Sequence, residues 1–554
     1  MNKFGIVSRQ LITTIALAVV ASFALAQDYD TVILNGRVMD PETNFDGIRN
    51  VGIKAGRIEA ITEDAIKGTE IIDATGLVVA PGFINTHSHS FAPFEQRIMA
   101  LDGTTSLLDI EVGVTSAPIF YDRYKGDSLL NYGVGISHEE VRRVVLDGLS
   151  QEETSDSTYV LKTRAKVEEL AAAKGEASKW AVQVPTPEQH KEILRMYEQG
   201  MLDGAISVNT TVGYMGYGVP TYEIFDLQKL AKKYDRIFGA HTRFGPTESL
   251  PTDYTLGVRE VLANMAALDG AAVMSHMQNS GWQETYEMCQ RFQEKGYTIF
   301  CEYYPSIFGN PNIATPQLMS KELRAANNMD PTSTVFDPRT AKPFESEEAF
   351  LALQKEDPGM GVFVLVRDEE WLDQWPYMKD AAIANDVVTY FDENGEILAE
   401  DADLSLYGGH PRNARSYSYV LRLARDLGIP LMDIVHNASY TPAKYFSQLG
   451  LKGMQERGRM QEGMIADITI FNPDTVADNA DMKIGNRATP PTGIPYVLVS
   501  GNFVVRDGKA LIGTRPGQPI RYEPITGMEI SLDYDDKKYQ WHADLPDHQD
   551  PMRD

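Results

Sequence analysis

The chain has 554 residues, 43% of them hydrophobic, with a formal net charge of −27 and a pI of about 4.8. That length suits one large barrel with an accessory domain, and the strong acidity argues against nucleic acid or an anionic membrane as a partner. An anionic small molecule is not excluded, because a local arginine pocket can override a distant field that salt screens within roughly 10 Å.

Residues 1–26 are typical of a secretory signal peptide. Lys3 and Arg9 form a basic start, an apolar segment follows over 11–24, and the small residues "ALA" end at Ala26, where we expect cleavage. An N-terminal membrane anchor is the alternative, but the apolar segment is short against the about 20 residues that a span requires. We therefore expect an exported protein, periplasmic if the source is Gram-negative, with no membrane span after cleavage.

Strand patterns at both ends of the chain predict one small β-domain. Residues 27–80 alternate apolar and polar side chains around glycine-containing turns, as in "YDTVILNGRVMD". The same texture returns within 441–520, as in "IPYVLVSGNFVVRDGK". We predict a small β-sandwich built from these two regions. Residues 521–554 are polar and acidic, which indicates a C-terminal extension.

The middle of the chain, residues 81–440, alternates short apolar strands with helical patterns such as "TPEQHKEILRMYEQG". This order is typical of the α/β class and of a (β/α)8 TIM-type barrel. A region around 307–365 fits the alternation poorly and indicates an insertion or a long loop. The eight predicted strands are "FINTHSH", "SLLDIEV", "LNYGVGISH", "GAISVNT", "IFGAHTRF", "AAVMSHMQ", "YTIFCEYYP" and "DAAIAND".

Two histidines stand at the end of the first barrel strand. Side chains alternate along a strand, so His87 and His89 point to the same side. Two neutral imidazoles a few ångströms apart suit a divalent metal. The pair alone does not distinguish such a site from a polar strand end with two solvated histidines.

Ionisable residues recur at the ends of later strands, which is where barrel enzymes carry their chemistry. Glu111 ends "LLDIE", His241 ends "IFGAH", His276 ends "AAVMSH" and Asp386 ends "AAIAND". With the first pair they make four imidazoles and two carboxylates, a ligand set suited to zinc or a similar divalent ion. We predict one metal site, or two metals bridged by Glu111.

The chain contains two cysteines, Cys289 and Cys301. No C-x-x-C metal motif is present, so any metal must be held by histidines and carboxylates. An exported protein could join the two cysteines in a disulfide, and the sequence leaves that pairing open.

The ordered set resembles the metal-dependent amidohydrolase superfamily, and within it the N-acyl-D-amino-acid deacylase (D-aminoacylase) branch. The resemblance implies a barrel with one or two zinc ions that hydrolyses the amide bond of an N-acyl-D-amino acid to a carboxylate and a free D-amino acid. It runs from "YDTVILNGRVMDPET" to "SGNFVVRDGK", and its marks are "APGFINTHSH", "GTTSLLDIEVG", "AHTRF", "SHMQNSG", "EYYP", "IAND", "GGHPRNARSY" and "GRMQEGMIADITIFNPDTVAD".

The resemblance also implies which residues hold each metal. His87 and His89 would bind one ion together with Asp386, and His241 and His276 would bind the other. Asp386 would serve in addition as the general acid and base, taking a proton from the attacking water and returning it to the leaving amine.

Three more residues are predicted to contact the substrate. By the resemblance, Tyr304 helps to polarise the scissile carbonyl, and Arg412 binds the α-carboxylate, for which its planar fork is suited. Arg243 lies just beyond the third histidine and could supply a second positive group for an acidic side chain, as in N-acyl-D-glutamate. The alternative is that Arg243 is a surface or ion-paired arginine.

The sequence departs from the branch at three places. Glu111 stands where many D-aminoacylases have a cysteine and other superfamily members have a carboxylated lysine. Asp386 lies in Asn-Asp-Val instead of Ser-Asp-Gly, which leaves Asp392 as a rival for its role. Residues 277–279, Met-Gln-Asn, replace a basic residue that often follows the fourth histidine.

Two other functions stay open. A dipeptidase or a cyclic-amide, hydantoinase-like hydrolase would use the same metal site. A non-catalytic barrel would keep the shape without the chemistry, although such a chain would be expected to have lost ligands. The acyl group, the amino-acid side chain, the number of metals and the oligomeric state do not follow from the sequence.

Overall fold

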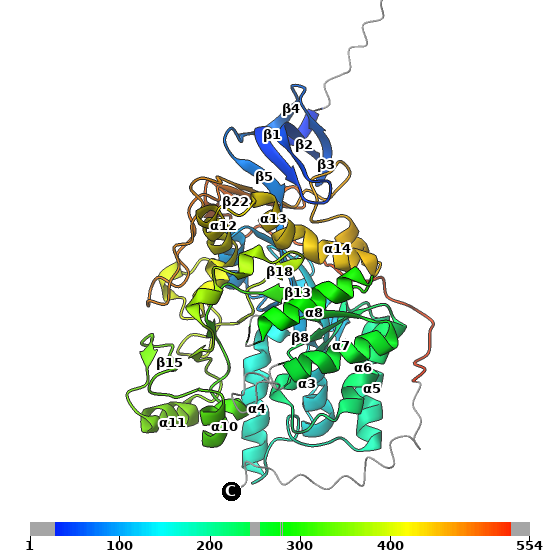
Figure 1. The fold of residues 1–554 in the computed structure, drawn as a ribbon, viewed down its shortest axis with the longest axis vertical. Coiled ribbons are helices and arrows are strands. Elements are labelled where there is room, and N and C mark those ends of the chain that lie inside the picture. The colour runs from blue at the N-terminus through cyan, green and yellow to red at the C-terminus, as the bar shows by residue number, and fades with distance from the viewer. Residues whose placement is uncertain (1–27, 244–254, 278, 280, 533–554) are drawn as a thin grey trace, which may run out of the picture.

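The computed structural model describes residues 28–243, 255–277, 279 and 281–532, so the predicted signal peptide lies outside the described residues. Figure 1 shows a barrel with a strand-rich domain projecting from one end and a smaller module beside it. The predicted fold class, a TIM-type barrel with an accessory β-domain, is confirmed.

Eight parallel strands form the barrel; seven lie within their predicted segments, and β8 extends two residues beyond its segment at each end. Helices cover them on the outside, which explains why these strands have apolar sequences without alternation. In chain order they are β6 (Phe83–Asn85), β8 (Thr104–Val114), β9 (Asn131–Ser137), β10 (Ser207–Thr210), β11 (Ile237–Ala240), β12 (Ala271–Met274), β13 (Ile299–Tyr303) and β18 (Ala381–Ile383).

The junction between β18 and β6 is made at the last residue of β6 and beyond the end of β18. The side-chain amide of Asn85 donates to Asn385 Oδ1 at 2.7 Å, and the backbone N–H of Asp386 donates to the carbonyl of His87 at 2.8 Å. Two short strands, β7 (Ser88–His89) and β19 (Val387–Val388), then pair in parallel. The junction therefore brings residues about 300 positions apart in the chain to the same rim.

The outer helices follow the predicted alternation. Helix α5 (Pro187–Leu202) begins with a capping box between Thr186 and Gln189 and precedes β10, and α6 (Thr221–Lys233) follows β10. Helix α7 (Leu256–Leu268) precedes β12, and α8 (Trp282–Glu294) precedes β13. Within the described ranges, no helix combines the length and the apolar character needed to cross a membrane.

Aliphatic and aromatic side chains fill the barrel interior, so the barrel is a packed core and not a channel. This packing leaves the C-terminal ends of the strands as the place where a pocket can form. The buried cluster includes Ile84, Leu108, Ile110, Ile206, Val273 and Phe300.

The accessory domain is one nine-stranded sheet made from both ends of the chain. Its central strand β5 pairs with β1 in parallel on one side and with β20 antiparallel on the other. The strands are β1 (Asp28–Asp40), β2 (Phe45–Lys54), β3 (Arg57–Thr62), β4 (Lys67–Asp73), β5 (Val78–Pro81), β20 (Ile468–Phe471), β21 (Tyr496–Val499), β22 (Asn502–Arg506) and β23 (Lys509–Ala510).

The region that fitted the barrel pattern poorly is a folded insertion and not a long loop. It has its own four-stranded sheet and three helices around a core that includes Val335, Phe350 and Val364. The elements are β14 (Phe308–Gly309), α9 (Pro316–Met319), α10 (Lys321–Ala326), β15 (Val335–Asp337), β16 (Lys342–Pro343), α11 (Glu347–Glu356) and β17 (Phe363–Leu365). In Figure 1 this insertion lies beside helix α4 (Val160–Ala173).

Two further features tie the fold together. Cys289 in α8 and Cys301 in β13 form a disulfide, which answers the question that the sequence left open. The described part of the C-terminal extension runs along the barrel, where the N–H groups of Tyr522 and Ile525 donate to the carbonyls of Gly204 and Leu202.

Candidate metal centre

The four predicted histidines meet at the C-terminal ends of the barrel strands. His87 Nε2 lies 3.1 Å from His89 Nε2, and His276 Nε2 lies 2.9 Å from His241 Nδ1. The first pair follows β6, while His241 directly follows β11 and His276 lies two residues beyond β12. Residues that are distant in the sequence thus form two adjacent imidazole pairs.

Glu111, on strand β8, lies between the two pairs. Its Oε2 is 3.3 Å from His87 Nε2 and 3.0 Å from His276 Nε2, and its Oε1 is 3.4 Å from His241 Nδ1. The Oε2 atom is buried and accepts no hydrogen bond from any described residue. A buried carboxylate oxygen without a donor is costly unless a cation takes its charge, so the geometry fits a metal bridge.

Asp386 completes the cluster from beyond β18. Its Oδ1 lies 3.4 Å from His87 Nε2 and 3.6 Å from His89 Nε2. The rival Asp392 lies outside the cluster, where its Oδ1 accepts the N–H groups of Asn394 and Glu396 in a turn. The structure therefore places Asp386, and not Asp392, with the histidines.

Two of these ligand candidates have left-handed backbone conformations. The φ angle is +30° at His276 and +45° at Asp386. Such conformations are uncommon for residues with a Cβ atom and cost of order 1–3 kcal/mol each, which the surrounding structure must supply. Strain of this kind is concentrated at functional sites, and here it aims both side chains into the centre.

The charges of the cluster favour a bound cation. Burial lowers the pKa of His89, but the carboxylates of Asp109 and Asp386 outweigh it and raise that pKa to about 9. Burial raises the pKa of Glu111, yet the facing histidines hold it well below its ordinary value. Imidazoles that attract protons beside ionised carboxylates can exchange those protons for a divalent ion. Three overlapping groups have donor atoms within 4.8 Å of one another: His87, His89 and Glu111; His87, His276 and Asp386; and Glu111, His241 and His276.

Two buried carboxylates that were not predicted from the sequence support the ligands. Glu302, on β13, contacts Nδ1 of His87 and accepts the hydroxyl of Thr86 at 2.6 Å. Asp109 Oδ1 lies 3.2 Å from Nδ1 of His89. Contacts of this type fix the orientation of a ligating imidazole and leave its Nε2 for the metal. A carboxylate inside an apolar strand, as in "IFCEYY", was the signal available for Glu302.

A cavity of about 170 Å³ opens over the cluster. Tyr304, immediately after β13, and Arg412 both line it, and the Arg412 guanidinium lies 4.1 Å from the centre of the Tyr304 ring. Arg412 also forms an ion pair of 3.3 Å with Asp386 Oδ2. The structure thus brings both predicted substrate-binding residues next to the metal ligands.

Arg243 has a different position. Its Nε donates to Glu260 Oε2 at 2.8 Å and its Nη1 donates to the carbonyl of Val219 at 2.6 Å. Arg243 is not among the residues that line the cavity. The structure therefore places it in the ion-paired arrangement that was the alternative reading of this residue.

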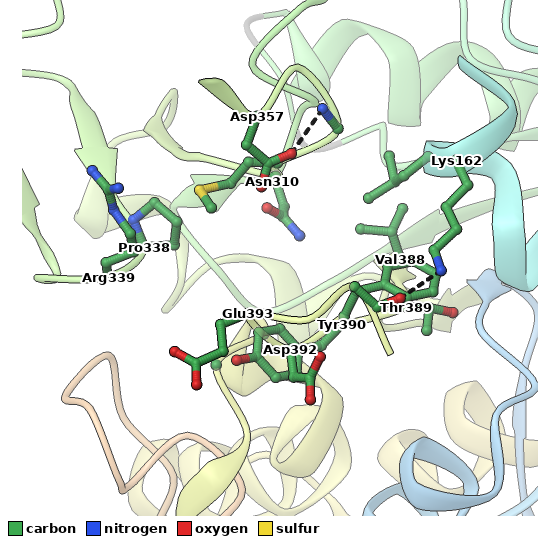
Figure 2. Close-up of a pocket in the computed structure, with 18 of the residues that line it drawn as sticks. Lys162, Asn310, Pro338, Arg339, Asp357, Val388, Thr389, Tyr390, Asp392 and Glu393 are labelled. Carbon is green, nitrogen blue, oxygen red and sulfur yellow. Dashed lines mark hydrogen bonds between the residues drawn. The ribbon is translucent and has the colours of Figure 1, made fainter. Parts of the chain in front are cut away.

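A larger cavity of about 580 Å³ adjoins the first (Figure 2). It lies between α4 and the insertion, and Asn310 and Val388 line both cavities. Figure 2 shows Lys162 on one side, where its ammonium donates to the carbonyl of Gly395 at 2.5 Å, and Asp392 and Glu393 on another. The larger cavity therefore adjoins the cavity over the metal ligands at these two shared residues.

The chain is similar to known proteins over most of its length, and not only at the metal centre. An N-acyl-D-glutamate deacylase from Alcaligenes xylosoxydans xylosoxydans is 25% identical over 517 residues, which cover 90% of this chain and 97% of that protein. The crystal structure of a D-aminoacylase matches with a TM-score of 0.68 at 19% identity, covering 89% of this chain and all of that one. No protein-family model matches the chain.

A second solved structure is similar over the same share of the chain. The N-acyl-D-glutamate deacylase from Bordetella bronchiseptica, complexed with zinc and a phosphonate inhibitor that mimics the tetrahedral intermediate, matches with a TM-score of 0.65 at 21% identity. The match covers 89% of this chain and 100% of that one. The similarity therefore includes nearly the whole chain and not only the strands that carry the histidines.

Proposed function

We propose that this chain belongs to the D-aminoacylase branch of the amidohydrolases and is a metal-dependent hydrolase that cleaves the amide bond of N-acyl-D-amino acids. The observation that carries the proposal is the complete ligand set: four histidines, Glu111 and Asp386 come from five strand ends, and each has a donor atom within 3.4 Å of at least one other member. A non-catalytic barrel gives no reason to keep such a set, with its strained backbone, intact.

Zinc is the ion that the donors fit best. Imidazole nitrogens and carboxylate oxygens without thiolate suit zinc in a catalytic site, and Glu111 is placed to serve one or two ions. A zinc ion bound there would lower the pKa of a water molecule and polarise the substrate carbonyl.

Asp386 would transfer the proton from the attacking water to the leaving amine. Asp386 is ionised, because Arg412 and His87 lower its pKa more than burial raises it. An ionised carboxylate at this position can accept a proton from the attacking water and return it to the nitrogen of the leaving amine. This transfer lets the amide bond break with release of a neutral amine.

Tyr304 and Arg412 would bind and orient the substrate. The phenol of Tyr304 can donate a hydrogen bond to the carbonyl oxygen as negative charge develops on it. The Arg412 guanidinium stacks on the Tyr304 ring. When the scissile carbonyl of the substrate faces the Tyr304 phenol, the α-carboxylate would lie beside this guanidinium. The two residues thus fix the two ends of an N-acyl amino acid.

We also propose that the protein is exported, to the periplasm in a Gram-negative source. The basic, apolar and small-residue order of residues 1–26 supports export. The disulfide between Cys289 and Cys301 supports an oxidising compartment, since such bonds rarely persist in the cytosol.

Hydrolysis by the zinc-loaded mature protein tests the function. The substrates would be N-acetyl-D-leucine, N-acetyl-D-methionine and N-acetyl-D-glutamate with their L-forms, one dipeptide and one hydantoin, and Asp386→Asn would run beside the wild type. We expect turnover of D-forms alone, and a loss of 10²- to 10⁴-fold in the variant, the range that general acid–base catalysis contributes. Turnover of only the dipeptide or the hydantoin would replace this function with the corresponding alternative.

A further inference from the structure

The insertion contributes one arginine to the metal pocket that the sequence analysis did not single out. Arg367 follows strand β17, lines the 170 Å³ cavity and is only 7% exposed. Its guanidinium lies 4.6 Å from the centre of the Tyr304 ring, the same ring on which Arg412 stacks at 4.1 Å. Two guanidinium groups therefore flank the tyrosine that faces the reacting carbonyl.

The charge of Arg367 has no counter-ion among the described residues. Its Nη2 donates to Asn279 Oδ1 at 2.8 Å, its Nη1 donates to the carbonyl of Ser306 at 3.5 Å, and its Nε is buried without a hydrogen-bond acceptor. Those partners are neutral. A buried cation held only by neutral groups is costly, and a bound anion would remove that cost.

The other arginines of the cavity are already paired. Arg164 forms an ion pair of 2.8 Å with Glu139, and Arg412 pairs with Asp386 at 3.3 Å. Residues 244–254, 278 and 280, which the structure does not describe, contain no lysine or arginine. Arg367 is thus the one arginine of the cavity lining, as described, without a carboxylate partner.

Arg367 also contacts the segment 277–279, which follows the fourth histidine. Residues 277–279 have no basic residue after the fourth histidine. Asn279 from this segment instead accepts a hydrogen bond from Arg367, so that the insertion brings a positive charge to the same place.

We propose that Arg367 binds the α-carboxylate of the substrate together with Arg412, and that the enzyme consequently prefers D-amino acids with neutral side chains. The proposal rests on the function proposed above. One unpaired arginine matches the single carboxylate that every N-acyl amino acid carries, and the described lining of the 170 Å³ cavity holds no second arginine without a carboxylate partner. The remaining lining includes Val112, Met329, Val364 and Val366, which favour a neutral side chain.

The test compares substrates with and without the α-carboxylate. For wild type we expect kcat/KM at least 100-fold higher for N-acetyl-D-leucine than for N-acetyl-D-leucinamide, and higher for N-acetyl-D-leucine than for N-acetyl-D-glutamate. In Arg367→Met the leucine-to-leucinamide ratio should fall at least tenfold, and Arg367→Lys should recover part of it. Arg324→Met is the matched control, because Arg324 lies in the same insertion and is equally buried, but pairs with Glu347 at 2.7 Å and lines neither cavity.

Binding of products gives a readout that does not need turnover. Calorimetry with D-leucine should show at least tenfold weaker binding to zinc-loaded Arg367→Met than to wild type, with D-leucinamide unchanged. Unchanged D-leucine binding, or a loss confined to N-acetyl-D-glutamate, would overturn the proposal, the latter by assigning Arg367 to the side chain. Absence of any N-acyl-D-amino acid turnover by wild type would instead contradict the proposed function.

Discussion

Glu302 contacts Nδ1 of His87 from strand β13, and this contact determines that His87 offers Nε2 to the centre. Both side chains are fully buried, so no water competes for either group. Glu302 therefore controls the geometry of the site although it lies behind a ligand.

We expect Glu302→Gln to weaken zinc binding by roughly 10- to 100-fold, which is the usual effect of removing a carboxylate behind a ligating histidine. The amide keeps the shape but not the charge that raises the basicity of the imidazole. Competition with a chromophoric chelator measures the dissociation constant. Glu95→Gln is the control, because Glu95 is equally buried and contacts none of the ligands; similar weakening in both variants would contradict the assignment.

Glu111 allows a test of the bridging position. Glu111→Cys should retain zinc, since a thiolate can also bridge, whereas Glu111→Ala should lose at least part of it, since the two imidazole pairs would then share no anion. Metal analysis after gel filtration gives the number of ions per chain in each variant. Equal zinc content in wild type and Glu111→Ala would show that Glu111 does not hold the metal.

Stability should depend on pH through Glu95. Burial raises the pKa of this carboxyl from 4.5 to about 7, although the N–H of Tyr390 donates to it and acts in the opposite direction. Between those values the folded state keeps a proton that the unfolded chain has lost, so the free energy of unfolding falls as pH rises from about 4.5 to 7 and is level above.

The size of that effect can be measured against Glu95→Gln, which has no proton to lose. At 1.36 kcal/mol for each pKa unit, the wild type should lose about 3 kcal/mol relative to the variant between pH 4.5 and 8. Urea unfolding of both proteins at several pH values would report it. Parallel pH profiles for the two proteins would refute the assignment to Glu95.

The disulfide gives a prediction that is independent of the metal. It closes a loop with a sequence separation of 12 between Cys289 and Cys301, for which the chain-entropy account gives about 3 kcal/mol. Dithiothreitol should lower the Tm of the wild type and leave that of a Cys289→Ser/Cys301→Ser double variant unchanged. If the reductant shifts neither protein, the bond does not contribute to stability.

Much of the barrel could be predicted because most of its strands show two features in the sequence: an apolar run and an ionisable residue at its C-terminal end. Segments such as "AAVMSH" are apolar along the buried strand and end in a ligand at its C-terminal end, so pattern and chemistry agree. The β-strands of the insertion are two or three residues long. Runs that short have no readable period, and the sequence therefore showed only that the region differs from the barrel.

The residues around the ligands were harder to predict, because their roles depend on contacts across the fold. Nothing near Glu302 in the sequence indicates that it faces His87. Arg243 was placed at the pocket because it follows His241 closely, but the chain turns there and its guanidinium meets Glu260. Arg367 lies 63 residues beyond Tyr304, and only the folded insertion brings it to that ring.

The pairing of strand β5 with the distant strand β20 limits when the accessory domain can fold. Its partner β20 begins 387 residues after β5 ends, at Ile468 compared with Pro81. At ribosomal rates of about 5–20 residues per second, roughly 20 to 80 seconds separate the two strands on the nascent chain. The sheet of the accessory domain therefore cannot be completed until nearly the whole chain has been made.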